Sequence, residues 1–129
     1  MTQLAVGGDS PRPLNQSTIL VVDDDADMRE ALRDVLGAEG YRVILACNGK
    51  VAFDLLLATL KRPCGIILDI TMPVMTGAGF YQAIRAVPNL TDIPVVFLTS
   101  NPSAAPSGVP ILQKTVSLER LLGMVAALF

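Results

Sequence analysis

The chain lacks histidine and tryptophan altogether, and it has only two cysteines among its 129 residues. Without histidine or thiolate neighbours for its acidic residues, a zinc site is disfavoured. Without tryptophan, the 51% of residues that are hydrophobic must build a mainly aliphatic core, which suits a parallel sheet buried on both faces. Cys47 and Cys64 are expected to be small buried apolar residues in a reducing compartment rather than a disulfide.

Blocks of basic charge and long apolar runs are also scarce. The net charge is −2, and no run of Lys or Arg could follow a nucleic-acid backbone or a membrane surface. The N-terminus has neither the basic start nor the apolar stretch of a signal peptide, and the apolar run at 121–129 is too short to span a bilayer. We therefore expect a cytoplasmic domain that binds neither nucleic acid nor membrane.

The length of the chain is that of a single domain. Residues 1–16 mix Gly, Ser, Pro, Asn and Gln without periodicity, so a flexible N-terminal tail is expected there and the folded domain at 17–129. Apolar runs rich in β-branched residues predict five strands, at 18–22, 41–46, 65–68, 93–98 and 111–113. Because helical spacing of apolar residues separates most of these runs, the chain is predicted to form a doubly wound parallel α/β sheet.

Polar residues and a glycine mark the ends of the predicted helices. Asp27 is available as the N-cap of the first helix, within an aspartate-rich loop, and Gly40 as its stop. Asn48 and Ser117 can cap the second and the last helix. The second helix is expected at 49–60, a short third helix after residue 77, and the last helix at 118–129.

Chemically useful side chains follow the apolar runs at the points where the strands should end. Asp23 and Asp24 follow the first run, Asp69 the third and Thr99 the fourth, while Lys114 follows the fifth. The carboxyl ends of parallel strands meet at one edge of a sheet, so these residues should share a crevice. Unit charges about 4 Å apart interact at roughly 4 kcal/mol with an effective dielectric of 20, so clustered carboxylates need a counter-charge. Mg²⁺, a hard cation with oxygen ligands, would supply it.

Asp69 can in addition act as a nucleophile, because an aspartyl carboxylate can accept a phosphoryl group and form an acyl phosphate. The ammonium of Lys114 and the hydroxyl of Thr99 would then contact that group. Each residue taken alone also has a structural interpretation, such as a helix-cap loop for the acid pair, a turn cap for Asp69 or a surface lysine. The combination favours the functional interpretation.

Two stretches of the sequence have a more specific pattern. They are the acid pair after its strand at 19–25 and the Asp-x-x-Met-Pro-x-Met-x-Gly motif at 69–77. Together with Thr99, Ser100 and Lys114, they resemble the receiver domain of two-component response regulators over residues 17–129. The resemblance implies a five-stranded flavodoxin-like sheet of strand order 2-1-3-4-5.

The resemblance also implies a role for each site residue. Asp69 would be phosphorylated by a sensor histidine kinase or a phosphotransfer protein. Mg²⁺ would be bound by Asp24, Asp69 and the backbone carbonyl of Thr71, with Asp23 acting largely through water. Thr99 and Lys114 would be the switch hydroxyl and the phosphate-contacting lysine. The domain would catalyse only its own phosphoryl transfer and dephosphorylation, and would signal to an unknown output protein as a monomer or weak dimer.

The sequence departs from the family in three places. Segment 100–110 contains three prolines and one glycine, so we expect a loop or at most one helical turn where receivers usually fit a fourth helix. Ile111 stands where the family usually has an aromatic switch residue, and Thr115 follows Lys114 where proline is usual. We hypothesise that phosphorylation orders or moves the 100–110 loop instead of rotating an aromatic side chain.

Two other functions compete with this interpretation. A degenerate receiver would act as a constitutive interaction module, as the missing helix favours and as the retained Asp69, Thr99 and Lys114 oppose. A phosphatase of the haloacid dehalogenase type would need a second acid two residues after its nucleophile, and Thr71 stands there after Asp69. The acid run at 23–25 could supply such a pair, but the chain is small for a cap-bearing enzyme.

Overall fold

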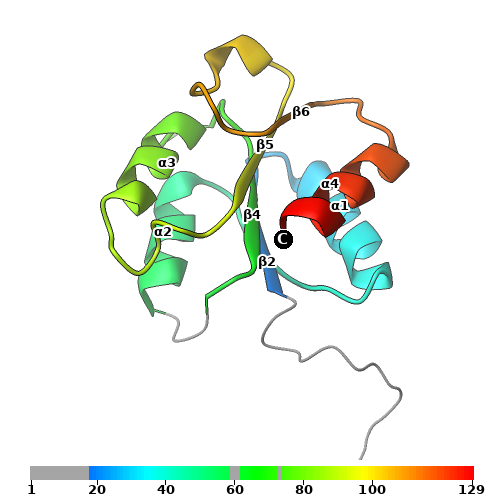
Figure 1. Cartoon of the computed structure of the whole chain (residues 1–129), viewed down its shortest axis with the longest axis horizontal. Coiled ribbons are helices and arrows are strands. Elements are labelled where there is room, and N and C mark those ends of the chain that lie inside the picture. The colour runs from blue at the N-terminus through cyan, green and yellow to red at the C-terminus, as the bar shows by residue number, and fades with distance from the viewer. Residues whose placement is uncertain (1–17, 59–61, 73) are drawn as a thin grey trace, which may run out of the picture.

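A computed structural model describes residues 18–58, 62–72 and 74–129 of the chain. The tail expected at 1–16, the end of the second helix expected at 59–60, and Pro73 of the predicted turn lie outside the described residues. The described residues form one five-stranded sheet with helices on both of its faces (Figure 1).

All strand pairs in this sheet are parallel, and the strand order is β3-β2-β4-β5-β6. In chain order this is 2-1-3-4-5, so the doubly wound flavodoxin-like prediction is confirmed. The central strands β4 and β5 are buried along their whole length and β2 from Ile19 onward, which explains their continuous apolar runs. The strands are β2 (Thr18–Val22), β3 (Arg42–Ala46), β4 (Gly65–Leu68), β5 (Val95–Thr99) and β6 (Ile111–Gln113).

The helices are divided between the two faces of the sheet. They are α1 (Ala26–Ala38), α2 (Gly49–Ala58), α3 (Gly77–Arg85) and α4 (Leu118–Leu128). In Figure 1, α2 and α3 lie on one side of the sheet, and α1 and α4 lie on the other. Each side holds its own aliphatic core. One is built around Leu20, Phe80 and Phe97, and the other around Ile19, Leu36 and Leu112.

The helix caps match the prediction with one correction. The side chains of Asn48 and Ser117 accept hydrogen bonds from the backbone N–H groups of Val51 and Arg120, at 2.9 and 3.2 Å. Gly40 has φ +99°, the left-handed conformation expected at a helix stop. The prediction that Asp27 is the N-cap of α1 is wrong.

The N-cap of α1 is Asp25, whose Oδ1 accepts from the N–H groups of Asp27 and Met28 at 3.0 and 3.4 Å. Asp27 lies in the first turn, where its charge still favours the helix dipole. The sequence offers several aspartates in a row, and local propensity does not choose between them. The exit of the chain from β2 decides which one has the extended cap conformation.

The expectation of two buried cysteines is wrong for Cys47, which is exposed, while Cys64 is half-buried. Cys47 directly follows β3, which is an edge strand with only one neighbour, so fewer atoms surround it. The fourth strand also starts later than predicted, at Val95 rather than at residue 93. Pro94 has no N–H for the ladder, although its carbonyl accepts from the N–H of Ile66 at 2.9 Å.

The segment between β5 and β6 contains a single 3-10 turn, η2 (Pro102–Ala104), in place of a helix. This confirms the prediction of a loop with at most one helical turn. Ala105 and Val109 from this loop pack against the core that Phe97 shares with α3. The loop therefore covers part of the sheet face that a full helix would cover.

Candidate functional site

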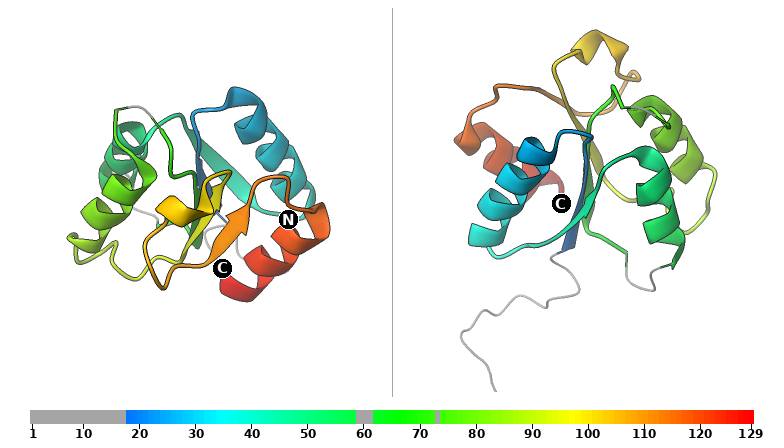
Figure 2. Two further views of the ribbon diagram at one scale, coloured as in Figure 1. Left: turned by 90° about the horizontal axis from the view of Figure 1, so that it is seen from above. Right: turned by 180° about the vertical axis from the view of Figure 1, so that it is seen from behind.

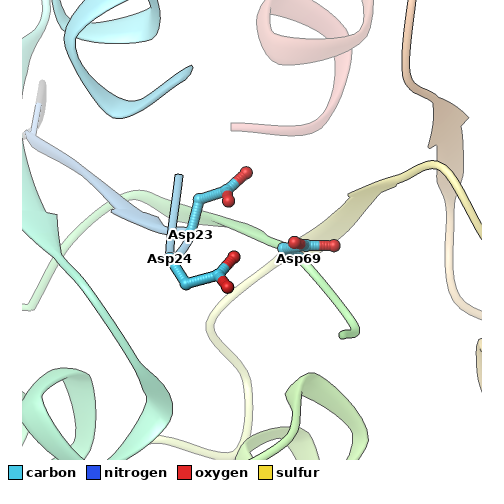
Figure 3. A group of neighbouring side chains, drawn as sticks. All are labelled: Asp23, Asp24 and Asp69. Atoms are coloured by element: carbon cyan, nitrogen blue, oxygen red, sulfur yellow. The ribbon is translucent and has the colours of Figure 1, made fainter. Parts of the chain in front are cut away.

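The three predicted acids meet at the carboxyl end of the central strands. β2 delivers Asp23 and Asp24, and β4 delivers Asp69. One carboxylate oxygen from each of the three lies within 4.8 Å of the others, and Figure 3 shows Asp24 extending toward Asp69. Asp23 and Asp69 are buried, whereas Asp24 is exposed. The cluster is therefore anchored in the core and open to solvent at Asp24.

Lys114 enters the same cluster from the end of β6. Its Nζ lies 3.0 Å from Oδ2 of Asp23 and 3.4 Å from Oδ2 of Asp69. The N–H of Lys114 donates to the carbonyl of Thr99 at 2.8 Å, which extends the β5·β6 ladder to the lysine. The shortened crossover thus still delivers the lysine to the acids, as predicted.

Burial and the neighbouring charges shift the pKa of both members of the Lys114–Asp23 pair. Burial raises the pKa of the Asp23 carboxyl, and this outweighs the lowering by the Asp25 N–H and by Lys114. For Lys114, burial alone would lower the pKa, but the hydrogen bond and charge of Asp23, with a contribution from Asp69, raise it. Lys114 is therefore a firmly charged ammonium at neutral pH.

Thr99 is fully buried at the end of β5. Its Oγ1 accepts a hydrogen bond from the N–H of Asn101 at 3.0 Å. Asn101 in turn begins η2, because its carbonyl accepts from Ala104 at 3.2 Å and its Oδ1 accepts from Ser103 at 3.0 Å. The hydroxyl of Thr99 is thus tied to the start of the loop that replaces the helix.

The turn after Asp69 is held by a close approach of two backbones. The N–H of Gly77 donates to the carbonyl of Ile70 at 2.8 Å, which closes the loop that contains Thr71. A Cβ at Gly77 would collide with the carbonyl of Asp69 and lie 2.7 Å from Cα of Ile70. The glycine of the sequence motif is therefore required by contact with the main chain of Asp69 itself.

Thr115, one of the three departures from the family, has φ +71°. Proline is locked near −65°, so this backbone excludes the residue that the family usually has here. A β-branched residue rarely adopts a positive φ, which makes this position strained. Lys114, the residue before this strained position, still contacts Asp23 and Asp69.

Arg29 was not predicted as a site residue, and its Nη1 donates to the backbone carbonyl of Asp23 at 2.7 Å. Arg29 follows the cap Asp25 by one helical turn, and the N–H of Asp25 donates to Oδ1 of Asp23 at 3.0 Å. The start of α1 therefore holds both the side chain and the main chain of Asp23. No local signal distinguishes this arginine from a surface arginine.

Replacing Arg29 with Met is expected to weaken Mg²⁺ binding about tenfold, because residues that orient metal ligands typically contribute tenfold or more to affinity. Loss of a positive charge alone would strengthen cation binding, so the sign of the change identifies a positioning role. Arg29→Lys, which keeps the charge and a donor, is the control and should stay closer to the parent protein. Calorimetric titration measures both, and tighter binding by Arg29→Met would contradict the positioning role.

The raised pKa of Asp23 makes a prediction for the metal-free protein. A carboxyl whose pKa is raised above its ordinary value of 3.8 contributes stability below that pH and loses it as the pH rises through the raised value. Asp23→Asn keeps an acceptor for the Asp25 N–H but cannot ionise. Its thermal stability relative to the parent in a chelator should therefore increase between about pH 4 and pH 7. A stability difference that stays constant over this interval contradicts the raised pKa.

The donor set fits a hard divalent cation. Three carboxylates face one ammonium within the cluster, so an excess of negative charge remains. All three acids present oxygen ligands, which suit Mg²⁺ and leave room for waters and a phosphoryl group. The described residues thus fit the predicted Mg²⁺ site.

Doubly wound α/β domains bind their ligands at the carboxyl ends of the parallel strands. This chain has that fold and places three acids and a lysine at those ends. The model of the response regulator receiver domain family matches residues 19–126, and the chain belongs to that family. No helix in the described part of the chain has the length and hydrophobicity needed to cross a membrane.

Several relatives resemble this chain in sequence. The response regulator MprA of Mycolicibacterium vanbaalenii is 36% identical over 117 residues, which cover 85% of this chain and 49% of that protein. The same protein of Mycobacterium avium is 35% identical over 117 residues, 85% of this chain and 50% of that one. The chain thus spans about half the length of these relatives.

Solved structures show the same fold. The chemotaxis protein CheY4 of Vibrio cholerae has a TM-score of 0.77 at 27% identity, over 88% of this chain and 99% of that one. The response regulator TrrA of Thermotoga maritima, solved in complex with Mg²⁺ and BeF, has a TM-score of 0.75 at 30% identity, over 88% of this chain and 100% of that one.

Proposed function

We propose that this chain is a phosphoacceptor domain of a two-component system, with its receiver domain at 17–129. A sensor histidine kinase or a phosphotransfer protein would phosphorylate Asp69. The observation that carries the proposal is the juxtaposition of the Asp69 carboxylate with Lys114 Nζ at 3.4 Å and with two further acids. Retention of this arrangement across a shortened crossover favours a working site over a degenerate one.

The chemistry requires little more than positioning and charge. A carboxylate oxygen of Asp69 attacks the phosphorus of the donor, the bond from phosphorus to the donor breaks, and an acyl phosphate forms on Asp69. Mg²⁺ would be held by Asp24, Asp69 and the carbonyl of Thr71, with Asp23 acting through water, and would neutralise phosphoryl charge. Lys114 would pair with a phosphoryl oxygen, and the Thr99 hydroxyl would donate to another.

The readout would pass through Thr99 to the 100–110 loop. The Thr99 oxygen can keep accepting from the Asn101 N–H while its proton turns to the phosphoryl group. Any shift of Thr99 is therefore transmitted to Asn101, the residue from which η2 begins. The domain would work in the cytoplasm as a monomer or weak dimer and would signal to an output protein through this changed surface.

The test is incubation of the full chain with acetyl phosphate and Mg²⁺, followed by intact-mass analysis. The proposal is supported if the chain gains one phosphoryl group with Mg²⁺ and gains none when excess chelator is present during the incubation. Amide hydrogen exchange of residues 100–110, with and without the phosphoryl mimic beryllofluoride, tests the readout separately. If amide exchange at residues 100–110 is the same with and without beryllofluoride, the proposed readout is wrong. If the chain neither gains a phosphoryl group nor binds beryllofluoride, the proposed phosphoacceptor function is wrong.

A degenerate receiver remains the second candidate because η2 replaces the helix on which receivers usually depend for output. Such a domain would make the same protein contacts with and without a phosphoryl donor. Under this alternative the intact mass stays unchanged at any Mg²⁺ concentration.

A further inference from the structure

Strand β3 forms one edge of the sheet, and β2 is its only neighbour among the described residues. The N–H of Asp23 donates to the carbonyl of Ala46 at 3.2 Å, so the backbone of Ala46 faces β2. In a parallel ladder, alternate residues of a strand direct both backbone groups to the same neighbour. Ile44 therefore also faces β2, whereas the N–H and C=O groups of Val43 and Leu45 face outward. The described part of the chain offers these outward groups no partner.

The strand lacks the usual protection of a free edge. Natural edge strands are very short, bulged, charged, covered or interrupted by proline, because their unpaired backbone groups recruit other strands. β3 has five residues without proline or glycine, and its only charge is at its first residue, Arg42. Figure 2, in its right view, shows β3 at the front of the sheet between α1 and α2, with no described element across it. Such an edge is complementary to a further strand.

Exposed apolar side chains border this edge on the α2 side of the sheet. Ile44 is 41% exposed and lies on the sheet face that α2 covers. Val51 and Leu55, each 38% exposed, lie one turn apart on α2. Gly49 approaches Met75, just before α3. Val51 is about 200° around the helix from Gly49, so the stripe of Val51 and Leu55 faces away from α3 and toward the free edge.

The outward groups of β3 are complementary to a second copy of the same strand. In an antiparallel pair about a two-fold axis at Ile44, Val43 of each copy lies opposite Leu45 of the other, and each such pair exchanges two N–H···O bonds. The two Ile44 residues then face each other with their Cα atoms about 4.5 Å apart. Because directly opposite side chains lie on the same face of a sheet, Val51 and Leu55 of each copy flank the two isoleucines.

The charges near the edge favour the same antiparallel direction. Arg42 is exposed and forms no salt bridge with any described residue. Antiparallel pairing places Arg42 beside the carboxyl end of the other β3, next to the strand end that carries the excess of acids. Parallel pairing would instead place the two arginines side by side. Lys50 and Asp54 pair with each other at 2.7 Å, so they add no net charge at the edge.

We propose that two copies of this chain associate through their β3 edges, in an antiparallel pair centred on Ile44, to form one continuous sheet. A pair of five-residue strands covers less than the roughly 800 Å² per partner of a standard interface, so the dissociation constant should lie between about 10 µM and 1 mM. The interface uses the sheet edge opposite β6 and the 100–110 loop. The association does not require phosphorylation of Asp69.

The first test uses the unmodified full chain. Sedimentation equilibrium between about 10 µM and 1 mM should show a monomer–dimer equilibrium. Over the same range, amide exchange at Val43 and Leu45 should slow by at least about twofold, since these N–H groups gain partners, whereas Ile44, which already faces β2, should change little. A monomer at every concentration would overturn the proposal. Protection of Val43 and Leu45 that is independent of concentration would also overturn it, since a segment of the same chain would then occupy the edge.

Charge variants test the centre of the interface. Ile44→Lys and Ile44→Glu each place like charges opposite each other across the axis, and each should weaken association at least about tenfold. An equimolar mixture of the two should dimerise again, since lysine then faces glutamate. Leu57→Lys is the matched control, because Leu57 is 57% exposed on α2 but about 200° around the helix from Leu55. It should associate within about twofold of the parent.

The mixture keeps this test decisive. If both Ile44 variants retain the circular dichroism of the parent and their mixture stays monomeric, the two-fold pairing is wrong.

A disulfide tests the geometry of the pair. Directly opposite residues with Cα atoms about 4.5 Å apart are within the range that a disulfide bridges. Because Cys47 is exposed, the test is made in a Cys47→Ser background. Mild oxidation should convert Ile44→Cys to a covalent dimer and leave Leu57→Cys mostly monomeric. Equal cross-linking of the two variants would overturn the proposal.

Discussion

Asp69→Asn is expected to take up no phosphoryl group from acetyl phosphate, whereas the parent protein gains one per chain in the presence of Mg²⁺. The amide that replaces the carboxylate has no anionic oxygen to attack phosphorus, and it removes one charge from the metal cluster. The change is small in volume, and Asp69 lies at the end of a strand whose residues are buried on both faces. The fold should therefore survive, as far-ultraviolet circular dichroism would verify.

Asp34→Asn is the matched control for this experiment. Asp34 is on α1 with 78% of its side chain exposed, and its nearest basic partner is Arg33 at 3.8 Å. The same chemical change at that site should leave labelling at the level of the parent. If Asp69→Asn still gains a phosphoryl group, the acceptor lies elsewhere and the proposed role of Asp69 is wrong.

Asp24→Asn should give a result between these two. Asp24 is a proposed ligand of Mg²⁺ and the exposed member of the cluster. Its replacement leaves the nucleophile intact but weakens the cation site, so labelling should slow and should recover as the Mg²⁺ concentration is raised. The contrast with Asp69→Asn separates a metal ligand from the acceptor.

Gly77→Ala is expected to destabilise the domain by about 3 kcal/mol, the upper end of the usual cost of overpacking. The added Cβ would collide with the carbonyl oxygen of Asp69 and would lie 2.9 Å from its carbonyl carbon. Backbone cannot rotate out of the way as a flexible side chain can. The turn must open instead, which strains the hydrogen bond from Gly77 to Ile70.

A loss of this size should lower the melting temperature by about 10 °C for a domain of this length. Phosphoryl uptake should fall with it, because the displaced atoms belong to the acceptor residue. Gly123→Ala is the control. Gly123 lies inside α4 with nothing within 4 Å of an added Cβ, so alanine there should stabilise the helix by about 0.5–1 kcal/mol. Equal melting temperatures for Gly77→Ala and the parent would contradict the close contact.

Local signals in the sequence were sufficient for most of the elements. The apolar runs at 18–22, 65–68 and 111–113 became strands with the predicted bounds. Asn48 and Ser117 cap helices as predicted, because a cap depends only on residues within the next turn. Loss of a helix at 100–110 was also predictable, since three prolines within eleven residues disfavour one wherever the segment lies.

The membership of the acid cluster was predictable for a different reason. Parallel strands bring their carboxyl ends together whatever their order, so Asp23, Asp24, Asp69 and Lys114 had to approach one edge. The strand order itself did not follow from periodicity and was inferred from the family resemblance. The choice of Asp25 over Asp27 as the cap, and the exposure of Cys47 beside an edge strand, also escaped the pattern.

What the sequence by itself determined is which segments are strands and helices and which polar residues stand at their ends. Only the tertiary structure decided that Lys114 pairs with Asp23 and Asp69, the latter 45 residues away, that Arg29 holds the carbonyl of Asp23, and that Gly77 must lack a side chain. The physical reason is the distance along the chain over which each interaction acts. Backbone preferences and caps act over a few neighbouring residues, whereas these contacts exist only after the sheet has brought distant segments within a few ångströms of one another.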